Sequence, residues 1–217
     1  MKNSAKKFIS TGFIFLITFA VFTILVHTVD QQTIPSINKK VGFATINVWF
    51  HNLTGVNFAL YNITDWLSIV PLAVCLIHGL AGFTQLITRK NIFKVDSYIL
   101  ISGVYYATVV LFFMLFEIFP VNYRPILING ACEASYPSST TLLVLTVMPA
   151  FIFNLRMKSS NRTIRILTTI FTVFMLIARL FSGVHWLTDI VGGILLSAGL
   201  FYIYKGTILI YDNKQTP

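Results

Sequence analysis

The sequence is poor in charge, and in acidic residues above all. Asp, Glu, Lys and Arg make up only 11% of its 217 residues, with 7 acidic against 16 basic side chains. Soluble domains carry about 25% charged residues, so the composition excludes an ordinary soluble domain. An apolar share of 56% and a mean hydropathy of +0.78 instead indicate an integral membrane protein.

Cysteine is scarce as well. Cys75 lies in a long apolar run and Cys132 in a polar segment, and this pair fits no metal-binding spacing and indicates no disulfide. The His, Asp and Glu residues show no metal-ligand spacing either. We therefore expect no metal ion and no other cofactor.

Long apolar runs are what the sequence does have. Crossing a membrane takes roughly 20 helical residues. The fourth run is short and begins with hydroxyl residues, so it could instead be a re-entrant segment. The first run lacks the small-residue cleavage site of a signal peptide and therefore indicates a retained membrane anchor. We expect an all-α polytopic protein, one six-helix transmembrane domain over residues 1–217, with spans at about 8–29, 66–88, 96–119, 139–155, 164–182 and 187–209.

The basic residues predict the orientation of these spans. Twelve of the sixteen flank the same membrane side, and only Lys39, Lys40, Arg124 and Arg179 do not. Basic residues favour the cytoplasmic side, so we expect a cell-membrane protein with both termini in the cytoplasm. The net charge of +9 then faces anionic lipid, and nucleic acid is not needed as a partner.

Three loops are expected outside, at 30–65, 120–138 and 183–186. The first is long for a connection and mixes apolar with polar residues, which suits a helix lying in the membrane interface. Such a helix could shape a lateral entrance for a lipid or could simply pack against the bundle.

Two of the outer segments carry features that suit an anion. Pro125 disfavours a helical conformation at Arg124, and the guanidinium can donate two parallel hydrogen bonds to a phosphate. Pro137 indicates a helix start, with unpaired amides near Ser138, Ser139 and Thr140 that form an anion cradle. The same residues are also typical of an ordinary helix N-cap that binds no anion, and both interpretations stay open.

The third segment holds Arg179, His185 and Asp189. If a helix begins near Val184, after the Gly183 turn, His185 and Asp189 lie on one helical face. The carboxylate can then hold the imidazole and leave its other nitrogen free to attack, while Arg179 points into the same space. Ionisable groups in apolar helices are costly and mark functional sites.

These segments resemble the type 2 phosphatidic acid phosphatase (PAP2) family, whose motifs read Lys-x6-Arg-Pro, Pro-Ser-Gly-His and Ser-Arg-x5-His-x3-Asp. Order, spacing and membrane side agree over roughly residues 95–195. The corresponding residues are Glu117-x6-Arg124-Pro125, Pro137-Ser138-Ser139-Thr140 and Ala178-Arg179-x5-His185-x3-Asp189.

The resemblance implies a metal-free phosphatase acting at the outer face on a polyprenyl diphosphate, phosphatidylglycerophosphate or phosphatidic acid. It implies that His185 attacks phosphorus to form a phosphohistidine while Asp189 orients the ring. Arg124, Arg179 and the amides near Ser139 would stabilise the oxyanion, and water would then release phosphate.

Two positions depart from the family pattern. Glu117 replaces a phosphate-binding lysine, and Thr140 replaces the histidine that protonates the leaving oxygen. Like charges about 4 Å apart cost of order 4 kcal/mol at an effective dielectric near 20. Glu117 is therefore expected to pair with Arg124 or another basic side chain, to be turned away from the phosphate, or to be protonated and supply the missing proton. The loss of the acid at Thr140 favours an acidic leaving group, and so a diphosphate lipid.

Several functions remain open on the sequence alone. The leading hypothesis is an integral-membrane lipid phosphate phosphatase, which Arg179, His185 and Asp189 favour. The alternative is a non-catalytic lipid-phosphate binding or transport protein that keeps the anion site, which Glu117 and Thr140 favour. Phosphoryl transfer to an acceptor other than water and a polytopic scaffold are the further alternatives.

Overall fold

The computed structural model describes residues 2–158 and 161–215; residues 1, 159–160 and 216–217 of the expected 1–217 domain lie outside the described residues. The elements in chain order are α1 (Lys2–Thr28), β1 (Gln32–Ile34), β2 (Lys39–Val41), α2 (Ala44–Thr54), α3 (Phe58–Leu67), α4 (Ile69–Arg89), the 3-10 turn η1 (Ile92–Lys94), α5 (Ser97–Ile118), α6 (Ser139–Lys158), α7 (Arg162–Phe181) and α8 (Leu187–Gln215).

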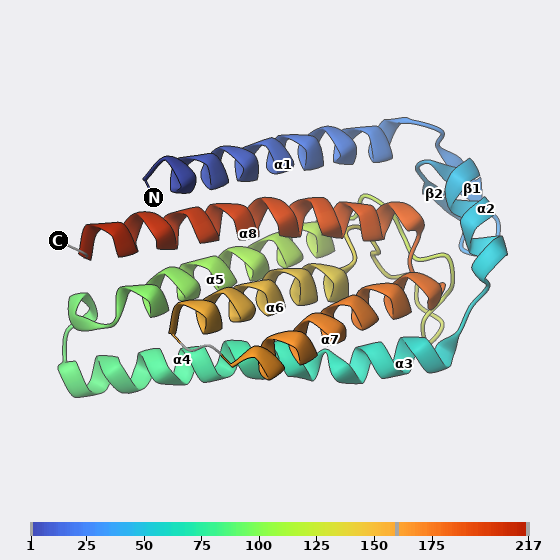
Figure 1. The fold of residues 1–217 in the computed structure, drawn as a ribbon. Coiled ribbons are helices and arrows are strands. Elements are labelled where there is room, and N and C mark those ends of the chain that lie inside the picture. The colour runs from blue at the N-terminus through green and yellow to red at the C-terminus, as the bar shows by residue number, and fades with distance from the viewer. Residues whose placement is uncertain (1, 159–160, 216–217) are drawn as a thin grey trace.

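The all-α architecture is confirmed. The long helices run side by side, with both termini at one end and β1, β2 and α2 at the other (Figure 1). Among the described residues, five helical segments are long and apolar enough to cross a membrane, with α3 and α4 counted as the single segment Phe58–Arg89. The chain is thus a multi-pass membrane protein.

The fourth predicted span corresponds to α6. Its apolar part, Ser139–Leu155, is shorter than the other five segments. The whole helix has 20 residues, about 30 Å at 1.5 Å per residue. It runs from the side of β1, β2 and α2 toward the termini (Figure 1). It is therefore a helix along the bundle and not a re-entrant segment. The helix is buried among other helices, where hydroxyls such as that of Thr146 bond to carbonyls.

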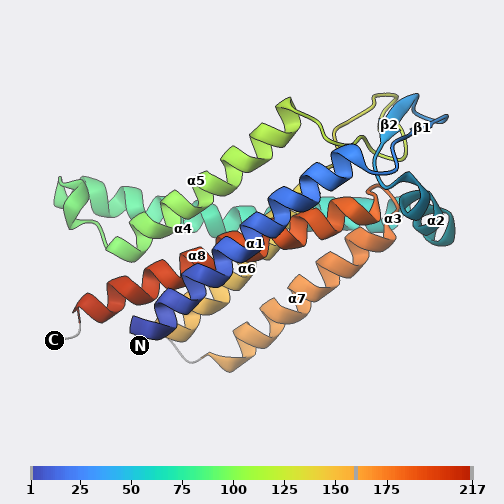
Figure 2. The ribbon, with the colours of Figure 1, turned by 90° about the horizontal axis from the view of Figure 1, so that it is seen from above.

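Helices α1 and α8 pack more closely than any other pair, and α1 lies over α8 when the bundle is seen from above (Figure 2). Small residues allow this approach. A Cβ added to Gly12 would lie 2.9 Å from the Gly199 carbonyl oxygen, and one added to Gly206 would lie 2.9 Å from that of Ala5. Close backbone contact through small residues is the usual way for membrane helices to associate.

The segment between α1 and α3 differs in part from the prediction. A helix was expected and α2 is present, but the antiparallel pair β1–β2 that precedes it was not foreseen. The inward face of α2 carries a polar residue: Asn47 is fully buried, and its amide donates to the Gly42 carbonyl and the Thr188 hydroxyl at 2.8 and 2.9 Å. These contacts support the packing interpretation of this helix.

Candidate active site

The turn between α7 and α8 carries His185. Helix α8 begins at Leu187, three residues later than the Val184 start that the sequence suggested, so the prediction that His185 and Asp189 share a helical face is wrong. The cause is the cap: the Asp189 carboxylate accepts the Trp186 backbone N–H at 2.9 Å, as the third residue of a helix does in a capping box. His185 therefore stands outside the helix.

The structure nevertheless brings the three ionisable groups together. His185 Nδ1 lies 3.5 Å from Asp189 Oδ2, and its Nε2 lies 3.4 Å from Arg179 Nη2. A guanidinium nitrogen can only donate, so Nε2 is the acceptor nitrogen and the ring proton belongs on Nδ1, facing Asp189. All three side chains are at most 4% exposed.

The surroundings of His185 keep its ring neutral. Burial, together with the positive charges of Arg179 and Arg124, holds the pKa of His185 well below its ordinary value, and the Ser135 carbonyl opposes this shift only in part. Because a lowered pKa favours the neutral ring, Nε2 keeps the lone pair that a nucleophile needs.

Arg124 lies beside the same ring and is 9% exposed. Its Nε lies 3.0 Å from the carboxylate of Glu133, and its backbone N–H donates to the Glu133 carbonyl at 3.0 Å. The expected pairing of Glu117 with Arg124 is therefore wrong. A bridge between Tyr123 and Ala134 folds the loop back on itself and places Glu133 next to Arg124. Glu117 is exposed and forms no ion pair within the described residues.

The predicted anion cradle at the start of α6 is only partly available. Ser138 caps the helix, since its hydroxyl lies 3.5 Å from the Thr141 amide. Its own N–H donates to the Asp189 carbonyl at 3.1 Å and is not a free donor. The amides of Ser139 and Thr140, in the first helical turn, have no helical acceptor. Pro137 thus lies before the N-cap residue Ser138 and not in the first turn of the helix, as the sequence suggested.

Two cavities meet at Ser139. The first, of about 250 Å³, is lined by Arg124, His185, Glu117, Glu133 and Ser139, together with aromatic and apolar side chains. The second, of about 290 Å³, includes Thr140 and Asp65 but is otherwise mostly apolar, and it shares Phe113, Ser139 and Leu142 with the first. The buried histidine and the arginine thus border a polar hollow beside an apolar one.

Comparison with known proteins decides the family. The profile described as "PAP2 superfamily" matches residues 68–209. The chain belongs to the PAP2 superfamily. The resemblance seen in the three sequence segments is confirmed, and the match includes α4 to α8 almost entirely.

The fold agrees with a solved PAP2 structure. The "first transmembrane PAP2 type phosphatidylglycerolphosphate phosphatase from Bacillus subtilis" superposes with a TM-score of 0.55 over 94% of this chain and 97% of the other, at 18% sequence identity. At that identity the likeness concerns the fold. No curated protein matches the sequence.

Other residues that shape this PAP2 site lie outside its motifs. Tyr61 and Thr64 on α3 contact the arginines, with the Thr64 hydroxyl accepting from Arg179 Nη1 at 3.1 Å. The Trp186 indole donates to the Tyr123 carbonyl at 2.6 Å. This bond joins the turn that carries His185 to the loop that carries Arg124. No spacing rule marks these residues, because they reach the site only through the packing of separate segments.

Gly183 has no room for a side chain. Its φ is +69°, and an added Cβ would lie 1.9 Å from the Gly55 carbonyl oxygen. Gly183→Ala should therefore push the turn that carries His185 away from the segment before α3. We expect a loss of at least about 1 kcal/mol in stability, from the φ alone, and a phosphate-binding affinity lowered by more than about tenfold. Thermal unfolding and phosphate titration measure both, with Gly103→Ala, where nothing lies within 4 Å, as the control.

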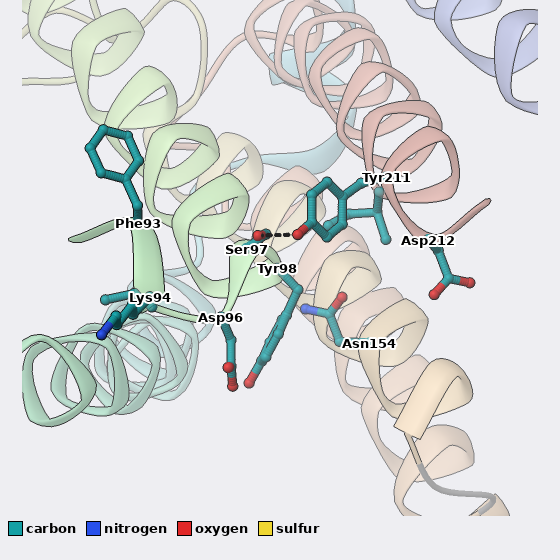
Figure 3. A pocket seen from close by; sticks show the side chains of 10 residues that line it. Phe93, Lys94, Asp96, Ser97, Tyr98, Asn154, Tyr211 and Asp212 are labelled. Carbon is teal, nitrogen blue, oxygen red and sulfur yellow. Dashed lines mark hydrogen bonds between the residues drawn. The ribbon is translucent and has the colours of Figure 1, made fainter. Parts of the chain in front are cut away.

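A third cavity lies elsewhere, at the end of the bundle that holds the termini. It has a volume of about 520 Å³, and Ser97 on α5 and Tyr211 on α8 hydrogen-bond across it (Figure 3). Asp96 and Asp212 outnumber Lys94 in its lining, which disfavours a phosphate group. None of the PAP2 motif residues lines it.

Proposed function

We propose that this protein is an integral-membrane lipid phosphate or diphosphate phosphatase that works through a phosphohistidine at the outer face of the cell membrane. The observation that carries the proposal is the buried group of His185, Asp189, Arg179 and Arg124 beside one polar cavity. PAP2 membership supports the reaction class.

Each residue has a role in the proposed reaction. His185 Nε2 attacks phosphorus, a P–N bond forms and the bond to the leaving oxygen breaks. Arg124 and Arg179 donate to the equatorial oxygens, where negative charge spreads in the transition state. Asp189 faces the proton on Nδ1 and stabilises the charge that the ring gains. Water then attacks phosphorus, the P–N bond breaks and phosphate leaves.

The neighbouring apolar cavity supports an amphiphilic substrate. Its lining comes from α4, α5 and α6 near the start of α6, so a chain could stay among apolar side chains while its phosphate reaches His185. The solved PAP2 neighbour is named for phosphatidylglycerolphosphate, which places this lipid beside phosphatidic acid and polyprenyl diphosphates among the substrates to test.

Phosphate release from a panel of these lipids, by purified protein in detergent, tests the proposal. We expect release from at least one of them and none from His185→Ala. A binding assay on the same panel separates the alternative, since binding without release by the wild type would indicate a lipid-phosphate binding or transport protein.

Glu117 remains a candidate proton donor to the leaving oxygen. It lines the cavity of His185 and has no ion pair among the described residues, while Thr140 cannot act as the acid. Glu117→Gln should then lower kcat for monoester lipids by about 10²-fold or more and affect diphosphate lipids less, because phosphate is the better leaving group. Equal rates for wild type and variant on a monoester would contradict this role; Asp212→Asn, which changes a carboxylate at the other end of the bundle, serves as the control.

A further inference from the structure

Tyr61 contacts both arginines of the site. Its ring centre lies 5.0 Å from the guanidinium carbon of Arg179 and 6.0 Å from that of Arg124. Cation–π contacts extend to about 6 Å, so one aromatic ring serves two cations. The PAP2 motifs do not include this residue, which lies before the matched region.

The charges around Arg179 explain why an aromatic ring suits this position. Arg179 is 1% exposed, and within the described residues no carboxylate lies within 4.0 Å of it. Arg124 adds a second positive charge close by, and burial strengthens their repulsion. The negative face of an aromatic ring offsets positive charge without accepting the in-plane N–H groups.

A carboxylate in place of the ring would act differently. It would neutralise an arginine by accepting its N–H groups, often two at once. An arriving phosphate would then have to displace it. Tyr61 accepts no N–H of Arg124 or Arg179, and beyond the contacts with Glu133, Thr64 and His185 the nitrogens Arg124 Nη1 and Arg179 Nε have no hydrogen-bond partner among the described residues. The site can therefore hold two cations and still offer these hydrogen bonds to an anion.

The backbone holds this ring in place. Asn57 caps α3 through its side chain, which accepts the Leu60 N–H at 3.0 Å. The Asn57 N–H in turn donates to the Ser182 carbonyl at 2.9 Å, in the turn that leads to His185. Thr64, one helical turn after Tyr61 and on the same face, accepts from Arg179. The first turns of α3 are thus hydrogen-bonded directly to the turn that carries His185 and to Arg179.

We propose that Tyr61 is a positioning residue that orients Arg124 and Arg179 for a phosphate group before the substrate binds. The inference rests on the proposed function only in taking phosphate as the ligand. Preorganised donors lose less entropy on binding, so the expected effect of the ring lies in affinity for the anion and in KM, with a smaller change in kcat.

Two substitutions separate the ring from its hydroxyl and its bulk. Tyr61→Phe keeps the aromatic face, whereas Tyr61→Leu keeps an apolar side chain without it. We expect Tyr61→Phe to bind inorganic phosphate within about twofold of wild type, and Tyr61→Leu to bind it about tenfold more weakly, the range of a buried cation–π contact. Tyr202→Leu, which removes a ring stacked on Phe8 and Phe15, is the matched control and should bind like wild type.

The outcomes distinguish this inference from the proposed function. Unchanged phosphate affinity in Tyr61→Leu, or equal losses in the leucine and phenylalanine variants, would overturn the role of the ring. Thermal unfolding of each variant shows whether a loss of binding reflects a loss of fold, and a loss that tracks unfolding would also overturn it. If the wild type binds phosphate through Tyr61 but hydrolyses no lipid, the proposed function fails and this inference stands.

Discussion

His185→Ala should reduce phosphate release by at least about 10³-fold, because the variant lacks the nucleophile of the proposed reaction. The variant should still bind phosphate, since Arg124 and Arg179 keep their partners Glu133, Tyr61 and Thr64. Phosphate release and phosphate titration on one preparation measure both quantities.

The same variant tests the covalent intermediate. Wild-type protein quenched during turnover of a labelled lipid should carry phosphate in an acid-labile, base-stable bond, as a phosphohistidine does, and His185→Ala should carry none. His27→Ala, at an exposed position near the end of α1, is the control and should be labelled like wild type. Normal release by the His185 variant would rule out the mechanism.

Asp189→Asn should leave the fold intact and remove most of the activity. The amide oxygen of Asn can still accept the Trp186 N–H that the carboxylate accepts at 2.9 Å, so the cap of α8 is kept. The same oxygen, Oδ2, lies 3.5 Å from His185 Nδ1, so the amide oxygen can also keep the ring proton on Nδ1. What the variant loses is the negative charge that stabilises the ring when it becomes positive on attack.

We expect a loss of about 10²- to 10³-fold in kcat, which is the scale of removing one group that stabilises transition-state charge, with little change in thermal unfolding. Asp189→Ala should lose activity as well, and about 1 kcal/mol of stability with the cap. An asparagine variant that turns over at the wild-type rate would show that the carboxylate acts in folding alone.

The sequence predicted the fold class and the proximity of the motif residues well, because both follow from strong local signals. Long apolar runs specify membrane helices, and charges inside them are rare enough to mark a site. Arg179, His185 and Asp189 lie within eleven residues of one another, so the chain itself keeps them close. Arg124 is distant from them in sequence, so only the predicted topology placed it near them. In the structure Arg124 and His185 line the same cavity.

What the sequence could not predict depends on contacts between distant segments. The partner of Arg124 is Glu133 because a bridge at Tyr123 and Ala134 sets the register of a loop without periodicity. Helix α8 starts at Leu187 because Asp189 serves as a cap as well as a site residue, and a spacing rule cannot assign both roles to one carboxylate.

The contact between α1 and α8 has a consequence for how the protein is made. These two helices are the first and the last of the described elements, and their backbones meet at Gly12 and Gly199. During synthesis α1 enters the bilayer long before its partner exists, and contacts so distant in sequence form late. Since Asp189 belongs to α8, the site is complete only after α8 has been made and has packed against α1. A nascent chain that stops after α7 should therefore have no activity toward lipid phosphates while it waits in the membrane.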